Sequence, residues 1–343
     1  MSENQAPNQP IRFSLPSKGV LAEDSLALLS RCGLEVYKPN PRQYRATIPG
    51  VEGLEILFQR PGDIVSSVRD GSVDIGLTGL DVVMEHSVPE DPILILHDEL
   101  GFGQCKLALA VPENMDSVTS VKQLINYAST LPQPIRIATK YPELTTAFLK
   151  PYALQYHLIT SEGTLELAPS IGYADMISDL VSSGKTLQEN RLRMLPDGVI
   201  LKSQACLIAN FDSLENKPKA MEIVRLLLEY LEAYIRGKEY TALFANVRGQ
   251  SREEIGTRIR SQHVISGLEG PTISDILSRS GDTNWFAINI VVRKDQLFQA
   301  VNELRSIGGS GVVVMPVNYI FEEEPPRYTA MLKAIQERKN NKG

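Results

Sequence analysis

The sequence predicts an α/β protein with a two-lobed core and a small C-terminal domain of the ferredoxin-like class. Apolar strand patterns alternate with helical patterns through the first two-thirds of the chain, which is typical of largely parallel sheets. A glycine turn at residues 101–103, followed by an apolar strand at 105–111, indicates the crossing into a second lobe. The last third has the element order βαββαβ, which is that of a ferredoxin-like domain.

Length and composition agree with a globular protein of several domains. The chain has 343 residues, of which 43% are hydrophobic and 22% are charged. At about 150 residues per domain, this length predicts two or three domains. The net charge of −6 gives no general attraction to nucleic acid, and no apolar run is long enough to span a bilayer. We therefore expect neither a nucleic-acid partner nor a membrane partner.

The cysteines and histidines form no recognisable metal or disulfide pattern. Cys32, Cys105 and Cys206 lack metal-ligand spacing, and the four histidines are scattered. Buried thiols in a reducing compartment are expected, so the protein is expected in the cytoplasm. A cysteine nucleophile is the less favoured alternative, because no histidine lies near any of the three in sequence. Residues 1–10 are polar and are expected to be a disordered start, not a signal peptide.

The first lobe begins with a strand, a turn and a helix. Strands are expected at 11–15, 42–48, 54–58, 73–78 and 93–96, and helices at 21–32, 64–70 and 80–86. Gly33 is a natural helix stop, and Asp63 is a credible N-cap for the second helix. The turn after the first strand presents Ser17 and Lys18 at a helix N-terminus, which suits an anion. A solvated lysine in an ordinary turn is the alternative.

The second lobe repeats the alternation. Its strands are expected at 105–111, 135–139, 156–159 and 176–181, and its helices at 120–127, 144–150 and 187–190. Strands at 199–201 and 204–209 are expected to return to the first lobe. The long helical pattern at 217–236 has an apolar face and is expected to pack on that lobe or to lead away from it.

The C-terminal third is expected to form the small separate domain. Its strands are expected at 240–247, 272–277, 285–292 and 311–317, and its helices at 251–261 and 294–306. Ser251 and Glu254 match a capping box at the start of the first of these helices. Residues 322–343 start acidic and end basic, so they are expected to be a marginal helix or a tail.

One turn in the second lobe has the composition of a phosphate cradle. It runs from Ser182 to Thr186 and follows an apolar strand that carries Asp179. Glycine lets the backbone approach a phosphate closely, and exposed N–H groups and hydroxyls donate to its oxygens. An acid just upstream can accept hydrogen bonds from ribose hydroxyls. The pattern alone favours the alternative, an ordinary connection between a strand and a helix.

Several motifs, taken in order over residues 11 to about 320, resemble those of the ATP phosphoribosyltransferase family in its long form. Each motif is weak alone, and their joint occurrence in this order carries the resemblance. They are Leu15–Gly19, Leu29–Gly33, Phe58–Ile64, Asp74–Gly79, Ala138–Pro142, Glu166–Pro169, Ala174–Asp175, Asp179–Leu187, Ala205–Ala209, Pro271–Ile273 and Gly309–Gly311.

The resemblance implies a fold and domain bounds. The core would be a two-lobed, periplasmic-binding-protein-like fold of type II, and the small domain an ACT-like regulatory domain. The implied bounds are 11–107 with 197–237 for the first lobe, 108–196 for the second lobe, 238–322 for the regulatory domain, and 1–10 and 323–343 for the tails.

The resemblance also implies a reaction and its control. Adenine N1 of ATP would displace pyrophosphate from C1 of 5-phosphoribosyl 1-pyrophosphate, giving phosphoribosyl-ATP in the first step of histidine biosynthesis. Mg²⁺ would be held mainly by the substrate pyrophosphate. Histidine would be the feedback inhibitor, and the chain would form a homo-oligomer, a hexamer or alternatively a dimer.

The family's functional residues carry over onto matching positions. Lys18, Arg60 and Glu166 are the candidates for catalytic roles. The candidates for substrate binding are Arg42, Thr78, Gly79, Asp175, Asp179, Ser182, Ser183, Gly184, Lys185 and Thr186. Within these sets the 182–186 turn would bind phosphate, Asp179 the ribose hydroxyls, and Glu166 ribose or the magnesium shell. Lys18, Arg42 and Arg60 would meet the triphosphate or pyrophosphate charge, and Thr78 and Gly79 the nucleotide.

Some of these assignments have alternatives. Arg60 could instead form a surface salt bridge with Asp63, and Asp175 could be structural. In the regulatory domain, the candidates for histidine contacts are Thr272, Ser274 and Ser310.

The sequence departs from the family pattern at two places. Val20 stands where the family often has arginine, and Thr164–Leu165 replaces the commoner Ser–Val. Two other functional classes stay open from sequence: a non-catalytic small-molecule-binding regulatory protein with a two-lobed solute-binding fold, and an inactive homologue that acts as a regulatory subunit. The intact 182–186 turn, together with Lys18 and Arg60, favours the transferase.

Overall fold

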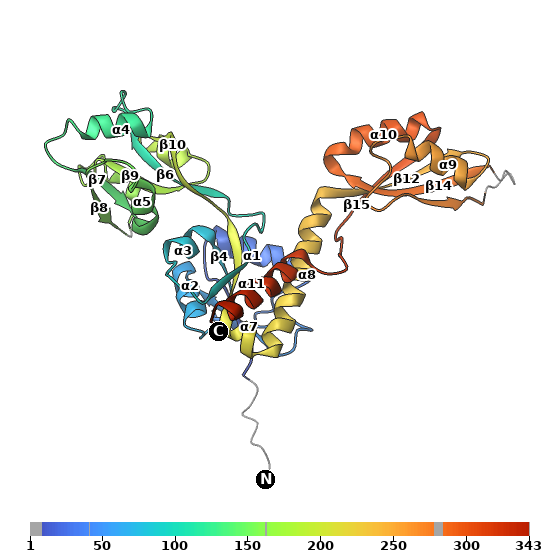
Figure 1. Cartoon of the computed structure of the whole chain (residues 1–343), viewed down its shortest axis with the longest axis horizontal. Helices are drawn as coiled ribbons and strands as arrows, with labels where there is room; N and C mark the ends of the chain where they lie inside the picture. The colour runs from blue at the N-terminus through green and yellow to red at the C-terminus, as the bar shows by residue number, and fades with distance from the viewer. Residues whose placement is uncertain (1–8, 41, 162, 278–283, 343) are drawn as a thin grey trace, which may run out of the picture. The chain divides into compact units, whose positions relative to one another are not determined.

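The chain forms two compact units (Figure 1). The computed structural model describes residues 9–40, 42–161, 163–277 and 284–342. The first unit comprises Met1–Leu226 and Pro326–Gly343, and the second comprises Leu227–Pro325. Of the predicted leader 1–10, residues 1–8 lie outside the described residues. Within the part that the structure describes, no helix combines the length and the apolar character needed to cross a membrane.

The first lobe is built on a six-stranded sheet of order β2-β3-β1-β4-β11-β5. Its strands are β1 (Ile11–Pro16), β2 (Arg45–Ala46), β3 (Leu54–Gln59), β4 (Ile75–Gly79), β5 (Ile93–His97) and β11 (Ala205–Asn210). β1 lies parallel to both β3 and β4, whereas β11 is antiparallel to β4 and β5. The carboxyl ends of β1, β3 and β4 therefore meet at one edge of the sheet.

The helices of the first lobe begin where the strands end. They are α1 (Val20–Arg31), α2 (Pro61–Arg69), α3 (Leu80–Glu85) and α7 (Phe211–Asn216). The predicted N-cap Asp63 is wrong, because α2 begins at Pro61 and its N-cap residue is Arg60. Proline suits the first turn of a helix, where its missing N–H has no partner to lose. Asp63 instead lies in that first turn, where its charge complements the helix dipole.

The predicted strand at 42–48 shortens to β2. The first residues of the predicted strand instead form a turn at Asn40. The Arg42 N–H donates to Asn40 Oδ1 at 3.0 Å, and the Gln43 N–H donates to the Asn40 carbonyl, also at 3.0 Å. Asparagine favours such turns because its side chain mimics the backbone.

The second lobe is built on a five-stranded sheet of order β10-β6-β9-β7-β8. Its elements are β6 (Cys105–Pro112), α4 (Val121–Ala128), β7 (Ile135–Thr139), α5 (Pro142–Leu149), β8 (Tyr156–Thr160), the 3₁₀ helix η1 (Leu165–Leu167), β9 (Met176–Val181), α6 (Lys185–Glu189) and β10 (Leu192–Ser203). β7 is parallel to β8 and β9, whereas β6 is antiparallel to β9 and β10. The carboxyl ends of β7, β8 and β9 therefore share one edge.

One strand assignment differs from the prediction. Val199 pairs with Ala108 and Leu201 pairs with Leu107, so the segment that was expected to return to the first lobe belongs to the sheet of the second. The sequence 196–198 reads as a turn, but β10 passes through it with a register shift between Met194 and Val199. The predicted bounds at 107/108 and 196/197 both fall inside strands, and the return to the first-lobe sheet is made by β11.

The second unit confirms the predicted βαββαβ order. After α8 (Pro218–Glu239), which begins in the first unit, come β12 (Tyr240–Arg248), α9 (Arg252–Arg260), β13 (Thr272–Asp275), β14 (Trp285–Arg293), the 3₁₀ helix η2 (Lys294–Gln296), α10 (Leu297–Ser306) and β15 (Gly309–Pro316). The sheet order is β13-β14-β12-β15. Buried residues of α9 and α10 pack on β12 and β14, and Figure 1 shows both helices on one face of the sheet. The predicted cap at Ser251 is also present, since its Oγ accepts from the Glu254 N–H at 3.2 Å.

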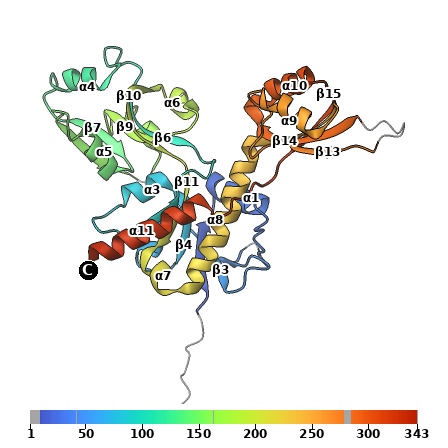
Figure 2. The ribbon, with the colours of Figure 1, turned by 45° about the vertical axis from the view of Figure 1, so that its right-hand side comes forward.

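Of the two alternatives for the C-terminal residues, a marginal helix or a tail, the structure has the helix: α11 (Pro326–Lys342) belongs to the first unit (Figure 2). Met331 and Ile335, one turn apart, are only 4% and 8% exposed. Arg327 forms a 2.7 Å ion pair with Asp98, and the Arg338 guanidinium lies 4.4 Å from the centre of the Phe211 ring. The sequence predicts this helix only weakly because polar residues outnumber the few apolar ones that it buries. In all other respects the predicted class is confirmed: a two-lobed core of the periplasmic-binding-protein-like type with an ACT-like domain.

Candidate functional site

The 182–186 turn lies at the shared carboxyl edge of the second-lobe sheet. Ser178 of β9 pairs with Thr139 of β7, which pairs in turn with Thr160 of β8. The residues that follow these three strands therefore gather at one edge, and ligands of open α/β sheets bind at such edges. From β9 this edge receives Asp179 and the turn, and Lys140 directly follows β7.

The turn itself is an open cradle. Gly184 has φ +76°, a conformation that glycine adopts without strain, and no atom lies within 4 Å of the position that a Cβ would take. A hollow of about 60 Å³ is lined by Glu166, Asp179, Leu180, Val181, Ser182, Ser183, Gly184, Thr186 and Leu187. The Lys185 side chain is exposed and is not part of this lining. Five of the seven predicted second-lobe binding residues are thus brought together around one hollow, with Glu166.

Asp179 is the acid of this hollow. Burial raises the pKa of its carboxyl group, while the Leu180 N–H, which donates to Asp179 Oδ1 at 2.8 Å, and the charge of Lys140 oppose the rise. The neighbouring charge of Glu166 raises the pKa further. Two neighbouring acids in the lining repel an anion but can accept hydrogen bonds from hydroxyl groups. This division favours phosphate at the glycine turn and sugar hydroxyls at Asp179.

Lys18 and Arg60 lie beside one another at the carboxyl edge of the first-lobe sheet. The Ser17 N–H donates to the Gln59 carbonyl at 2.8 Å, so the turns that follow β1 and β3 run side by side. Both basic side chains are exposed. Among the described residues no ion pair joins Arg60 to Asp63, so that alternative is not found. Two exposed cations on adjacent turns can attract a polyphosphate.

Arg42 lies at the same end of the first-lobe sheet. β2 and β3 are antiparallel, with Arg45 opposite Leu57 and Ala46 opposite Ile56. Because the strands are antiparallel, the residues that precede β2 run toward the end of β3, which Arg60 follows. Arg42 is exposed, as its predicted role requires.

Thr78 and Gly79, which are predicted to contact the nucleotide, are buried and take part in packing. The Thr78 side chain is fully buried, and its hydroxyl donates to the Pro61 carbonyl at 3.3 Å. A Cβ at Gly79 would lie 2.5 Å from Asp81 Oδ1. These two residues therefore hold the start of α2 and make room for Asp81. Their burial follows from the central place of β4 in the sheet, which the local sequence pattern does not reveal.

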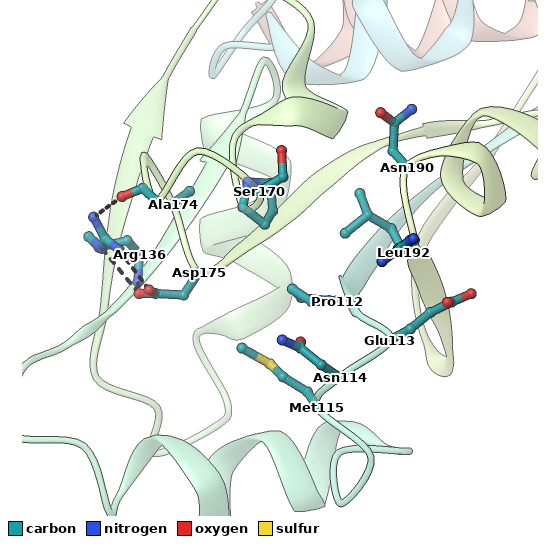
Figure 3. Close-up of a pocket in the computed structure, with 13 residues that line it drawn as sticks. Pro112, Glu113, Asn114, Met115, Arg136, Ser170, Ala174, Asp175, Asn190 and Leu192 are labelled. Atoms are coloured by element: carbon teal, nitrogen blue, oxygen red, sulfur yellow. Dashed lines mark hydrogen bonds and ion pairs between the residues drawn. The ribbon is translucent and has the colours of Figure 1, made fainter.

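Asp175 precedes β9 whereas the turn follows it, so the two lie at opposite edges of the second-lobe sheet. The two oxygens of Asp175 accept from the Arg136 guanidinium at 2.8 and 3.2 Å (Figure 3). This pair lines a hollow of about 610 Å³. Asp179 lies four residue steps along the chain from Asp175, or roughly 13 Å at 3.3 Å per residue. The structure therefore does not bring Asp175 to the cradle, and its ion pair with Arg136 is in keeping with the structural alternative.

A contact between the lobes is the main feature that the sequence did not predict. Asp81, at the start of α3, is 5% exposed. Its Oδ2 accepts from the Tyr141 hydroxyl at 2.7 Å, and its Oδ1 accepts from the Ser203 hydroxyl at 2.6 Å. The only signal was that Tyr141 and the segment before Asp81 belong to family motifs, which does not predict a contact across 60 residues.

A second buried acid of α3 caps a helix of the other lobe. Glu85 Oε1 accepts from the Glu143 N–H at 2.9 Å, and Oε2 accepts from the Leu144 N–H at 3.0 Å. These N–H groups belong to the first turn of α5, which lacks partners within its own helix. Burial raises the pKa of Glu85, and the two N–H donors oppose the rise. α3 thus makes two separate polar contacts with the second lobe.

The cysteines are unsuited to nucleophilic catalysis. Burial raises the pKa of Cys32 to about 12 and that of Cys105 to about 11, and it also raises the pKa of Cys206. A nucleophilic cysteine needs a lowered pKa. All three thiols are free.

The predicted histidine-contact residues lie on opposite edges of the sheet in the second unit. Thr272 and Ser274 are exposed on β13, and Ser310 is exposed on β15. β14 and β12 stand between these strands, so the two groups are separated by three strand spacings, roughly 14 Å. A single amino acid cannot contact both groups within one chain.

Family models match both units. A model described as "ATP phosphoribosyltransferase" matches residues 60–233, and one described as "HisG, C-terminal domain" matches residues 237–319. The chain belongs to the ATP phosphoribosyltransferase family. α11 lies beyond both matched segments.

Relatives share most of the chain. "ATP phosphoribosyltransferase 2, chloroplastic" from Arabidopsis thaliana is 43% identical over 336 residues, which cover 95% of this chain and 81% of the relative. "ATP phosphoribosyltransferase" from Methanocaldococcus jannaschii is 34% identical over 312 residues, covering 90% of this chain and 99% of the relative. Family members are pentosyltransferases of histidine biosynthesis, and phosphoribosyltransferases generally use a divalent metal.

A solved structure shares the fold of the core. The "ATP phosphoribosyl transferase (HisG:HisZ) complex from Thermotoga maritima" aligns with a TM-score of 0.51 and 24% identity, covering 65% of this chain and 98% of that chain. The common fold supports the two-lobed description and is silent on individual side chains.

Proposed function

We propose that this chain transfers the phosphoribosyl group of 5-phosphoribosyl 1-pyrophosphate to N1 of the adenine of ATP, and that the 182–186 turn and the basic residues of the first lobe hold the substrates. The observation that carries the residue assignment is the grouping of Asp179 and the glycine turn around one hollow at the carboxyl edge of a sheet. Membership of the family supports the reaction.

The chemistry needs positioning and charge, and it needs no covalent nucleophile. Displacement at an anomeric carbon passes through an oxocarbenium-like state, which pre-organised charges stabilise. We assign the 5-phosphate to the N–H groups and hydroxyls of the 182–186 turn, and the ribose hydroxyls to Asp179. Lys18, Arg42 and Arg60 supply positive charge for the polyphosphate groups. Raised thiol pKa values support a mechanism without a cysteine nucleophile.

We further propose that Mg²⁺ accompanies the pyrophosphate. Among the described residues no group of three or more His, Cys, Asp or Glu side chains is arranged to hold a metal. Mg²⁺ commonly binds through one or two carboxylates and substrate phosphates, so this donor set fits a metal held mainly by the substrate. Glu166, which lines the cradle, is the candidate for a protein carboxylate, and the metal would neutralise the leaving group.

We also propose that histidine is a feedback inhibitor. We propose further that the chain forms a homo-oligomer, a hexamer or alternatively a dimer. Because β13 and β15 are opposite edges of one sheet, a histidine that used both Ser274 and Ser310 would require two copies of the chain. This requirement supports an inhibitor site that forms on assembly. The free state of the three cysteines supports a reducing compartment, for which we propose the cytoplasm.

The test of the reaction is direct. Full-length protein with ATP, phosphoribosyl pyrophosphate and Mg²⁺ should form phosphoribosyl-ATP, measured as rising near-ultraviolet absorbance and by chromatography. Gly184→Asp should abolish turnover, because it places a negative charge and a strained side chain in the cradle. Gly172→Asp is the matched control, since Gly172 has φ +73° and open space around it but lies at the opposite edge of the second-lobe sheet. Equal activity of the two variants would refute the cradle assignment.

The inhibitor is tested separately on the same protein. Histidine should bind in calorimetry and reduce turnover, and Thr272→Val with Ser274→Ala should weaken both effects at least tenfold while leaving turnover without histidine unchanged. Inhibition that survives this double substitution would remove these two residues from the inhibitor site. Sedimentation with and without histidine then reports whether the oligomer is needed.

A further inference from the structure

Two lysines of the second lobe face one another across an antiparallel strand pair. Lys106, near the start of β6, is the register partner of Lys202, near the end of β10. Directly opposite residues of an antiparallel pair have neighbouring side chains on one face of the sheet, and like charges in that position are destabilising. The free protein therefore carries an unfavourable charge pair here.

Neither lysine is neutralised within the described part of the chain. No ion pair of the described residues involves Lys106 or Lys202, and both side chains are exposed. The hollow that the two lysines line also contains two acids, Asp98 and Glu99. Asp98 is already paired with Arg327 of α11 at 2.7 Å. Among the described residues, two cations and one acid without an ion pair thus line the same hollow.

The lysines line a hollow that adjoins the cradle. This hollow of about 490 Å³ is lined by both lysines together with Val181 and Ser182. Val181 is the register partner of Lys106 on its other side, so Lys106 lies between the end of β9 and Lys202. Ser182 also lines the hollow of the glycine turn. A phosphate ester held by the turn can therefore extend another anionic group toward the lysines.

We propose that Lys106 and Lys202 bind the diphosphate of phosphoribosyl pyrophosphate, the group that leaves in the reaction. The inference rests on the proposed function and adds a second anion site to it. The bond from adenine N1 to ribose C1 forms, and the bond from C1 to the diphosphate oxygen breaks. The diphosphate departs with that electron pair. Negative charge thus increases on the diphosphate in the transition state, where two nearby cations are most effective.

A diphosphate also removes the unfavourable feature of the free protein. An anion between two like charges converts their repulsion into two attractions. This predicts opposite effects on stability and on binding when a lysine is neutralised, whereas a merely structural lysine would lose stability. The triphosphate of ATP is the competing source of the same chemistry, and the kinetic measurements below distinguish the two.

The experiment compares Lys106→Gln, Lys202→Gln and the double variant with wild type. We expect the affinity for inorganic pyrophosphate, measured by calorimetry, to fall about tenfold in each single variant and further in the double variant, each tenfold being about 1.4 kcal/mol. The KM for phosphoribosyl pyrophosphate should rise in parallel, while the KM for ATP stays within twofold. The thermal midpoint of the free protein should be unchanged or raised.

Two controls accompany the series. Lys122→Gln removes an exposed charge from α4 of the same lobe and should change neither affinity nor KM. Lys106→Arg with Lys202→Arg keeps both charges and should restore most of the pyrophosphate affinity. Failure of this restoration, with the glutamine variants impaired, would show that charge is not what the site supplies and would overturn the proposal.

Two results would overturn the proposal. One is a double variant whose pyrophosphate affinity and KM values stay within twofold of wild type. The other is a rise in the KM for ATP alone. Either result with normal wild-type turnover leaves the proposed function intact. Wild-type protein that neither turns over nor binds pyrophosphate would instead overturn the proposed function, and this inference with it.

Discussion

The Tyr141 hydroxyl donates to Asp81 Oδ2 at 2.7 Å and so joins the second lobe to the first. The partner carboxylate is 5% exposed and also accepts from Ser203. Burial and the Asp81 charge raise the pKa of Tyr141 well above its ordinary value, so the phenol stays protonated and remains a donor at any physiological pH. This fixed donor is the basis of the first prediction.

Tyr141→Phe should lower the free energy of unfolding by about 1.5–3 kcal/mol, because a hydrogen bond to a buried charged acceptor is lost. Urea unfolding measures this change. Tyr152→Phe is the control, since it keeps the ring that contacts Phe148 and removes the hydroxyl of an exposed residue. Equal losses in the two variants would show that the hydrogen bond to Asp81 does not contribute to the free energy of unfolding as proposed.

The pH profile of turnover should show the raised pKa of Asp179. A carboxylate accepts from ribose hydroxyls, and protonation removes part of that capacity. Because burial raises the folded-state pKa, kcat/KM should fall with decreasing pH at a higher pH than an ordinary aspartate predicts. Asp179→Asn should reduce kcat/KM and lose this acid limb. A limb that persists unchanged in the variant would assign it to another group.

The same shift predicts a gain in stability. A folded-state pKa above the unfolded value means that the stabilising contribution is complete below the unfolded pKa and is lost as pH rises through the folded pKa. At neutral pH the ionised Asp179 is therefore destabilising, and Asp179→Asn should unfold at a higher temperature than wild type. Asparagine retains an Oδ1 that can accept from the Leu180 N–H. A lower midpoint in thermal unfolding at pH 7 would contradict this account.

α11 should contribute to stability through one face only. Met331→Ala should lower the free energy of unfolding by about 2 kcal/mol or more, because Met331 is 4% exposed. Leu332→Ala, at the next position, should cost less than about 0.5 kcal/mol, because that side chain is 41% exposed. Chemical denaturation of the two variants makes the comparison, and similar losses would mean that α11 does not dock by this face.

Two helical glycines should respond to alanine in opposite ways. A Cβ at Gly237 in α8 would lie 2.6 Å from the Asn318 carbonyl oxygen, so Gly237→Ala forces backbone to move and should destabilise the second unit. No atom lies within 4 Å of a Cβ at Gly62 in α2, so Gly62→Ala should stabilise by up to about 0.5–1 kcal/mol. Thermal unfolding of both variants tests the pair, and the same sign in both would refute the close approach at Gly237.

Local patterns were sufficient to predict most of the helices and strands. β12 and β14 alternate buried and outward residues, and the Ser251 cap is a hydrogen bond between residues close in sequence. The neighbouring residues therefore suffice to predict the strands and the cap. The turn at 182–186 was singled out by its composition, but its assignment to phosphate came from the resemblance to the family. Asp175 was assigned by the same resemblance, and its distance from the turn follows from the direction of β9, because a strand carries its two ends to opposite edges of a sheet.

Long-range relations account for the remaining errors. Lys106 and Lys202 become neighbours only through the register of β6 and β10, and the sequence placed the second strand in the wrong lobe. Thr78 became buried because β4 lies between β1 and β11 in the sheet. α11 has too few apolar residues for its sequence alone to predict more than a marginal helix or a tail. It is stabilised by a surface that lies far away in sequence. These facts depend on tertiary pairing, which periodicity does not encode.

The docking of α11 also bears on solubility. β5 is the last strand of the six-stranded sheet, and its Ile95 is 42% exposed. An open sheet edge with an apolar side chain is a template on which strands of other molecules can add. α11 packs against β5 and so obstructs that approach. A chain that lost residues 326–342 would therefore become prone to aggregation, detectable by light scattering, even while its cradle kept its shape.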